Sequence, residues 1–418
     1  MNSRERVMAA VNHQTPDVVP VDFGAVSVTG IHCRTVAALR DYYGLEKKPV
    51  RIVEPLQLLG EVDNELADII GIDTVSLYGP ADWFGIRTKG EVEQVTPWGQ
   101  TVLIAQEIDL TPDAKGDVYC YPQGDRSCLP SGILPSQGYF FNAIERDIEV
   151  DDDDLNPDDN LEEFQPISDE DVQWFAREAA KRRATGKAVV ASFGGTGLGD
   201  VAQVPGMSLK DPKGIRTVSE WYVSLIARAD HVQELFERQI DTAISNYEKL
   251  WAAVGENVDI VFTCGCDFGT QESQFCSVDT FNELWLPSYK RMNNWIHENT
   301  TWKTMKHTDG AIFPLIPGLI EGGIDILNPV QFNAAGMDPQ GLKDNFGDRI
   351  TFWGGGVDTQ KVLPYGTPAE VRAQVLDQYR ILGAGGGMVL GSVHNVQADV
   401  PVENLVAMID AIHEIRKG

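Results

Sequence analysis

The sequence predicts an α/β fold in which eight short strands alternate with helices, the pattern of a single (β/α)8 barrel spanning residues 1–418. From residue 17 onward the chain repeats one unit, an apolar strand followed by a loop and an amphipathic helix. Several strand segments are continuous β-branched or aromatic runs, as expected for a parallel sheet buried on both faces. An apolar share of 43% is enough to fill a large core.

A helix over residues 4–13 precedes the first strand. The eight predicted strands are Val19–Phe23, Ile72–Leu77, Ala188–Phe193, Val258–Thr263, Lys303–His307, Ile324–Asn328, Ile350–Trp353 and Met388–Gly391. A long helical segment, Val218–Val254, is expected in two pieces. The last helix is indicated by apolar residues that recur at helical spacing, namely Leu405, Met408, Ile409, Ile412 and Ile415.

Residues 80–187 interrupt this alternation, because the segment is too long for one crossover. We expect it to be an insertion after the second strand, with a β-hairpin over residues 90–104. The acidic run 151–159 predicts a solvated loop, and a helix should start near Ser168. Strand-to-helix loops form the active-site face of a barrel, so the insertion is expected to serve as a lid or a docking surface.

The charge balance excludes two classes of partner. With 62 acidic and 34 basic residues the formal net charge is -28, which argues against nucleic acid and against an anionic membrane surface. The first residues contain no apolar stretch typical of a signal peptide, and no apolar run approaches the length of a membrane helix. Six cysteines in so long a chain predict reduced thiols and a cytoplasmic protein.

The strongest candidate for chemistry lies at the end of the fifth predicted strand. His307 and Asp309 are two residues apart, so they point to the same face if the strand continues through them. A histidine and a carboxylate together bind a metal or form an acid/base pair, although a hydrogen bond that closes the strand end is the simpler alternative. His394 follows the last strand and should face the same mouth of the barrel, unless it is a structural histidine.

Polar residues after other strands are further candidates. Cys264 and Cys266 form a C-x-C pair, for which a polar pocket role is favoured over metal ligation. Asp267 is a candidate for handling protons. The candidate substrate-binding residues are Gln271, Gln331, Asp358 and Asn395.

A glycine-rich segment, residues 194–200, follows the third predicted strand. It lacks the G-x-G-x-x-G spacing of a dinucleotide loop, and the residues after it are a poor start for a helix. The segment therefore predicts an active-site loop rather than a phosphate cradle.

Three blocks of the chain resemble the uroporphyrinogen-decarboxylase superfamily. They are residues 4–6 with 15–21, residues 352–364, and residues 394–404. The similarity covers nearly the whole chain and implies that superfamily's (β/α)8 barrel. True decarboxylases carry an arginine-rich substrate loop with the pattern M-R-Q-A-G-R, whereas residues 22–30 here contain no arginine. A porphyrinogen with eight carboxylates needs cationic partners, so decarboxylation of uroporphyrinogen is disfavoured.

The other branch of the superfamily comprises corrinoid-linked methyltransferases, including methylcobamide:coenzyme M methyltransferases and aryl-ether O-demethylases. Its thiol-methylating members bind zinc through a strand-end His-x-Cys and a cysteine on the last strand. Here the first motif is His307-x-Asp309, and His394 stands near the second position. The resemblance implies that zinc or another divalent metal is held by His307, Asp309 and His394.

The same resemblance implies the reaction and the partner. The expected enzyme moves a methyl group between a small methoxylated or thiol substrate and a corrinoid protein that carries methylcobalamin. Members of the superfamily often form dimers, which implies a homodimer. Two alternatives remain open: a metal-free decarboxylase or lyase in which His394 and Asp267 handle protons, and a non-catalytic accessory protein that binds a corrinoid protein.

Overall fold

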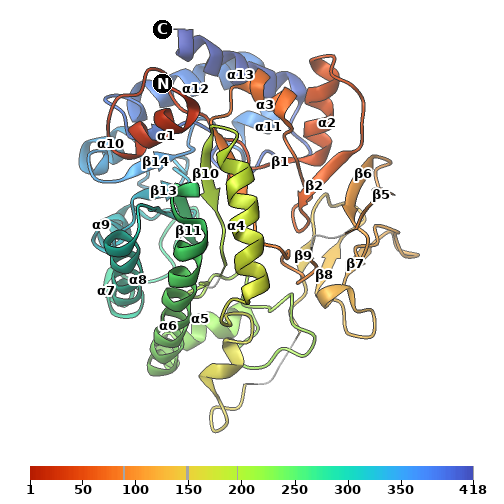
Figure 1. Cartoon of the computed structure of the whole chain (residues 1–418), viewed down its shortest axis with the longest axis vertical. Coiled ribbons are helices and arrows are strands. Elements are labelled where there is room, and N and C mark those ends of the chain that lie inside the picture. The colour runs from red at the N-terminus through yellow and green to blue at the C-terminus, as the bar shows by residue number, and fades with distance from the viewer. Residues whose placement is uncertain (88–89, 147–149, 195, 418) are drawn as a thin grey trace.

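A curled, parallel, seven-stranded sheet forms the centre of the computed structural model, which describes residues 1–87, 90–146, 150–194 and 196–417. Figure 1 shows helices packed around this sheet, an α/β arrangement like that of a TIM barrel. The strand order is β15-β14-β13-β12-β11-β10-β4, so each strand pairs with its neighbours in chain order. The bounds are β4 Thr74–Leu77, β10 Ala188–Ala191, β11 Ile260–Cys264, β12 Lys303–His307, β13 Ile326–Asn328, β14 Thr351–Trp353 and β15 Met388–Val389.

The first predicted strand, residues 19–23, lies between the two edges of this sheet but is too short to count as a full strand. Val21 forms a parallel bridge with Leu390, directly after β15. On the other side the Asp73 amide donates to the Val21 carbonyl at 2.9 Å, directly before β4. The segment thus contacts both edge strands of the curled sheet.

The predicted helices are present in the described residues, with the long one broken at Arg228 into α5 and α6 as expected. The helices flanking the main sheet are α1 Ser3–Val11, α2 Cys33–Tyr42, α3 Asn64–Ile70, α4 Asp169–Arg183, α5 Val218–Ala227, α6 Ala229–Val254, α7 Val278–Leu284, α8 Leu286–Asn299, α9 Ile316–Glu321, α10 Pro339–Phe346, α11 Val362–Tyr365, α12 Pro368–Leu382 and α13 Val402–Lys417. Within the described part of the chain, no helix combines the length and apolar character needed to cross a membrane.

Two apolar clusters fill the molecule. The larger one lies between the strands and the surrounding helices. The smaller one gathers side chains from alternate strand positions, including Met305 and Trp353, and α1 packs against it through Val7, Ala10 and Val11. Since Met305 and His307 point to the same face of β12, the small cluster forms the floor beneath His307.

The amino-terminal ends of the strands are tied together by buried aspartates. Asp73, Asp259 and Asp325 each precede or begin a strand, and each accepts the backbone N–H of a neighbouring strand segment. Each also contacts basic side chains: Arg6 and Arg416 for Asp73, Arg4 and Arg183 for Asp259, and Lys303 with His297 for Asp325. In barrel folds this end serves stability, whereas chemistry sits at the opposite end.

Between β4 and β10 the chain forms further strands at one side of the main sheet (Figure 1). β5 (Glu91–Val95) and β6 (Thr101–Ala105) are an antiparallel hairpin. β6 also pairs in parallel with β2 (Val50–Glu54), which in turn pairs with β3 (Leu59–Gly60) and, through it, β1 (Ile31–His32). A three-stranded sheet follows, with β7 Val118–Cys120, β8 Gly132–Leu134 and β9 Asn142–Ala143. The hairpin is therefore built into a sheet with residues from before β4.

Candidate active site

A cavity of about 1340 Å³ reaches the carboxyl ends of the strands. Its lining includes side chains from the ends of several strands, as expected where chemistry sits in barrel folds. His307 is the last residue of β12, and Asp267 and His394 follow β11 and β15. Residues far apart in the sequence thus meet at one mouth.

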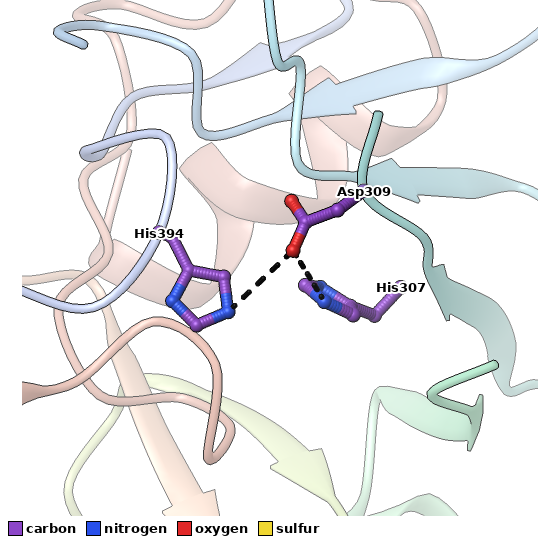
Figure 2. A group of neighbouring side chains, drawn as sticks. All are labelled: His307, Asp309 and His394. Carbon is purple, nitrogen blue, oxygen red and sulfur yellow. Dashed lines mark ion pairs between the residues drawn. The ribbon is translucent and has the colours of Figure 1, made fainter. Parts of the chain in front are cut away.

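His307, Asp309 and His394 converge there, as Figure 2 shows, with the two imidazoles on either side of one carboxylate oxygen. Asp309 Oδ2 lies 3.5 Å from His307 Nε2 and 3.8 Å from His394 Nε2. The two rings are 5.4 Å apart between centroids. These three residues offer ligand atoms that all lie within 4.8 Å of one another.

The tautomer of His307 is set by Asn328, the last residue of β13. Asn328 donates from Nδ2 to the Trp353 carbonyl at 3.1 Å, which turns its Oδ1 toward His307. His307 Nδ1 therefore donates to Asn328 Oδ1, at 2.8 Å. The neutral ring then has its lone pair on Nε2, the atom that faces Asp309 and the cavity, which is the state a metal ligand needs.

Two carboxylates make this place favourable for positive charge. Asp267 Oδ1 lies 3.6 Å from His307 Nε2, nearly as close as Asp309. Burial disfavours protonation of His307, but Asp309 and Asp267 outweigh burial and raise the pKa of His307 to about 9. Burial opposes ionisation of Asp309, yet the neighbouring His307 holds the pKa of that carboxyl below its usual range. Burial lowers the pKa of His394.

The residues present fit a divalent metal. In a tetrahedral set with bonds of 2.0–2.1 Å, neighbouring ligand atoms are about 3.3 Å apart. The distances of 3.5 and 3.8 Å around Asp309 Oδ2 are close to that spacing. Two imidazoles and one carboxylate suit zinc or another borderline divalent metal, and a cavity on one side leaves room for a further ligand.

The loop that carries Asp309 is held by two of the predicted residues. The Asp309 amide donates to Asp267 Oδ1 at 2.8 Å, and the Gly310 amide donates to Gln331 Oε1 at 2.7 Å. Asp267 thus meets both the backbone of Asp309 and the ring of His307. The Gln331 side chain is buried and contacts the site through the backbone amide of Gly310.

The other predicted substrate-binding residues lie around the site with partners of their own. Gln271 donates to Gln360 Oε1 at 3.1 Å. Asp358 Oδ1 accepts the amides of Gln360 and Lys361. Asn395 accepts the Gly30 amide and donates to the Ser27 carbonyl and Gln57 Oε1. Among the described residues that line the cavity are Ser27, Gly30 and Gln57, but not Gln271, Gln331, Asp358 or Asn395.

Three residues at the site were not anticipated from the sequence. Asn328 orients His307, and the fully buried Lys306 donates from Nζ to the carbonyls of Cys266 and His307. Asp200, from the glycine-rich segment, lines the cavity. A polar residue inside a buried strand, such as Lys306 or Asn328, is the one sequence signal that could have indicated the first two. Gly195 of the glycine-rich segment lies outside the described residues.

We expect Asn328→Ala to weaken binding of a divalent metal about 10–100-fold, because His307 loses the partner that fixes its ring and tautomer. Competition with a chromogenic chelator measures the affinity. Asn345→Ala is the control, since Asn345 is exposed and its side chain donates to the Gly341 carbonyl of its own helix. Equal affinities in both variants would contradict the assigned role of Asn328.

Comparisons with known proteins agree with this architecture. Residues 210–415 match the family model described as uroporphyrinogen decarboxylase (URO-D). A curated uroporphyrinogen decarboxylase from Psychromonas ingrahamii is 32% identical over 79 residues, which are 19% of this chain and 22% of that protein. A solved structure of a methyltransferase from Methanosarcina mazei superposes with a TM-score of 0.54 at 14% identity, covering 99% of both chains.

The chain therefore belongs to the uroporphyrinogen-decarboxylase superfamily. The match to the curated decarboxylase spans about a fifth of that protein, so it does not show that this chain has the same activity. The likeness to the methyltransferase structure extends over the whole chain and concerns the fold.

Proposed function

We propose that the protein is a methyltransferase that moves a methyl group between a small methoxylated or thiol substrate and the corrinoid of a partner protein, assisted by a divalent metal. The observation that carries the proposal is the convergence of His307, Asp309 and His394 at the cavity, with His307 Nε2 directed toward Asp309. The metal, zinc by its donor set, would be held by these three residues. When bound, it supplies a Lewis acid toward an ether oxygen or a thiol sulfur.

The chain's own residues prepare the site for that chemistry. Asn328 keeps the His307 ring in one orientation, so that no reorganisation is needed when a substrate arrives. Asp267 fixes the Asp309 loop through the backbone and adds negative charge beside His307. The small apolar cluster below His307 excludes water from the side opposite the cavity.

The cavity is a poor host for a porphyrinogen. Within the segment 22–30, the residues that line the cavity carry no positive charge. They are Phe23, Gly24, Ser27, Val28 and Gly30. The arginines among the described lining residues are already paired: Arg51 with Glu91, Arg87 with Asp171, and Arg182 with Glu178. A substrate with eight carboxylates would find few free cationic partners there, which favours methyl transfer over uroporphyrinogen decarboxylation.

We further propose that residues 1–418 act as one barrel unit and that residues 80–187 form an insertion beside its mouth. Several residues of the segment line the cavity, among them Asp82, Trp83, Asp171 and Trp174. A lid or a docking surface for the corrinoid protein is the role we propose for it. We propose a cytoplasmic location, in keeping with six free thiols.

The test is a methyl-transfer assay with the purified protein, free cob(I)alamin, and a panel of methyl ethers and methylated thiols. Protein-dependent loss of the cob(I)alamin absorbance, with formation of methylcobalamin, is the expected result. Release of CO2 without any corrinoid would favour the decarboxylase or lyase alternative. Tight binding of a corrinoid protein with no turnover on any donor would favour the accessory protein.

A further inference from the structure

Asp200 is a buried carboxyl that lies in the same cavity but outside the His307, Asp309 and His394 set. Its residue is 6% exposed, and its Oδ1 accepts the Ala202 amide at 3.0 Å. Its Oδ2 lies against Gly265, where an added Cβ would come within 2.6 Å. No partner for Oδ2 is found in the described part of the chain, so this oxygen is available to a molecule in the cavity.

The loop that carries Asp200 is held firmly to β11 and its neighbours. The thiols of Cys264 and Cys266 donate to the carbonyls of Gly197 and Gly199 at 3.1 and 3.5 Å. Burial raises the pKa of both thiols, which keeps them as S–H donors. The Trp285 indole also donates a hydrogen bond to the Leu198 carbonyl of the loop, and the Leu198 amide donates to Gln239 Oε1. A carboxyl on so tightly bonded a loop has a fixed position.

The surroundings of Asp200 favour its protonated form. Burial, and then the charge of Asp267, raise the pKa of Asp200 to about 6. The titratable groups that face Asp200 are Asp267, Cys264 and Cys266 on and after β11, Lys306 and His307 on β12, and Tyr222 and Tyr289 on α5 and α8. Of these, Lys306 and His307 oppose the shift, and burial with Asp267 outweighs them.

We propose that Asp200 is a catalytic acid, which protonates the ether oxygen of a methoxylated substrate as its methyl group leaves. This inference rests on the proposed function. The bond between the methyl carbon and oxygen breaks with its electron pair on oxygen, and the proton of Asp200 forms the alcohol or phenol. The methyl group bonds to the cobalt(I) corrinoid, whose electron pair makes the new bond, and Asp200 is left as a carboxylate that solvent reprotonates.

The test compares Asp200→Asn with the wild type on two matched ethers, anisole and 4-nitroanisole, with cob(I)alamin as acceptor. Loss of a general acid should slow anisole about 100-fold or more, because phenolate is a poor leaving group. 4-Nitrophenolate leaves without a proton, so its rate should change less than about tenfold. In the wild type the anisole rate should fall as the pH rises through about 6, and this limb should vanish in Asp200→Asn.

Gly265→Ala provides a second variant that keeps the carboxyl but displaces it, since the new Cβ would meet Asp200 Oδ2. It should slow anisole more than 4-nitroanisole, as Asp200→Asn does. Equal losses on both ethers in both variants, or no loss on either, would overturn the catalytic role. Unchanged metal content and melting temperature would show that the variants remain folded.

An infrared measurement keeps the inference testable even if the proposed function fails. Burial also raises the pKa of Asp82 to about 6 and that of Glu54 to about 7, so the wild type is compared with Asp200→Asn in a difference spectrum. Beyond the bands of those two carboxyls, the wild type should show a protonated carboxyl band that is lost between pH 5 and pH 7 and is absent in Asp200→Asn. Absence of this band from the wild type would overturn the inference. Lack of methyl transfer by the wild type to any acceptor would instead refute the proposed function alone.

Discussion

Replacing His307 with alanine is expected to remove most of the bound divalent metal and to lower methyl transfer by about a thousandfold or more, a loss of ~4 kcal/mol of transition-state stabilisation. Within the site, the His307 ring is held at Nδ1 by a buried partner, Asn328. Without it, Asp309 and His394 leave a two-ligand site, which holds zinc weakly.

Elemental analysis of the purified variants and the cob(I)alamin assay measure the two effects separately. His297→Ala is the matched control: His297 is on the surface of α8 and pairs with Asp325 at the opposite end of the strands. It should keep its metal and its activity. If His307→Ala retained full metal occupancy and full activity, both the proposed metal site and its proposed role in the reaction would be refuted.

The main sheet could be predicted from the sequence because parallel strands buried on both faces are continuous apolar runs, which need no partner to be recognised. The bounds Lys303–His307 for β12 are those of the structure. The strands before β4 were not predicted. Val50–Glu54 pairs with the two-residue strand β3 and, in parallel, with β6 about fifty residues later, and this second, non-local pairing has no local signal.

The site was predictable in part because three of its residues follow strands that the sequence predicts. His307, Asp309 and His394 follow strand ends, and a curled parallel sheet brings strand ends together. Asp200 could not be anticipated, because one acid in a glycine-rich loop has no periodic pattern. Its burial depends on Gly265 and on the thiols of Cys264 and Cys266, which contact the loop only in the folded chain. The positions of Gln271 and Asp358 beside the site also depend on the conformation of their loops, which has no periodic pattern in the sequence.

Asp73→Asn is expected to destabilise the fold by about 3–5 kcal/mol, because it breaks a buried network of ion pairs. Asp73 is 2% exposed and joins three segments of the chain. Its Oδ1 accepts from Arg6 of α1 at 2.7 Å, and its Oδ2 accepts from Arg416 of α13 and from the Val21 amide. The variant leaves Arg416 mostly buried without its carboxylate.

Urea denaturation followed by circular dichroism measures the change in the free energy of unfolding. Asp377→Asn is the control, because Asp377 and Arg380 form an exposed pair on α12 that should contribute no more than about 0.5 kcal/mol. A further variant, Arg416→Met, should cost less when added to Asp73→Asn than on its own, since the two residues share one interaction. Strictly additive losses would mean that the Asp73–Arg416 pair does not hold the carboxyl-terminal helix to the sheet.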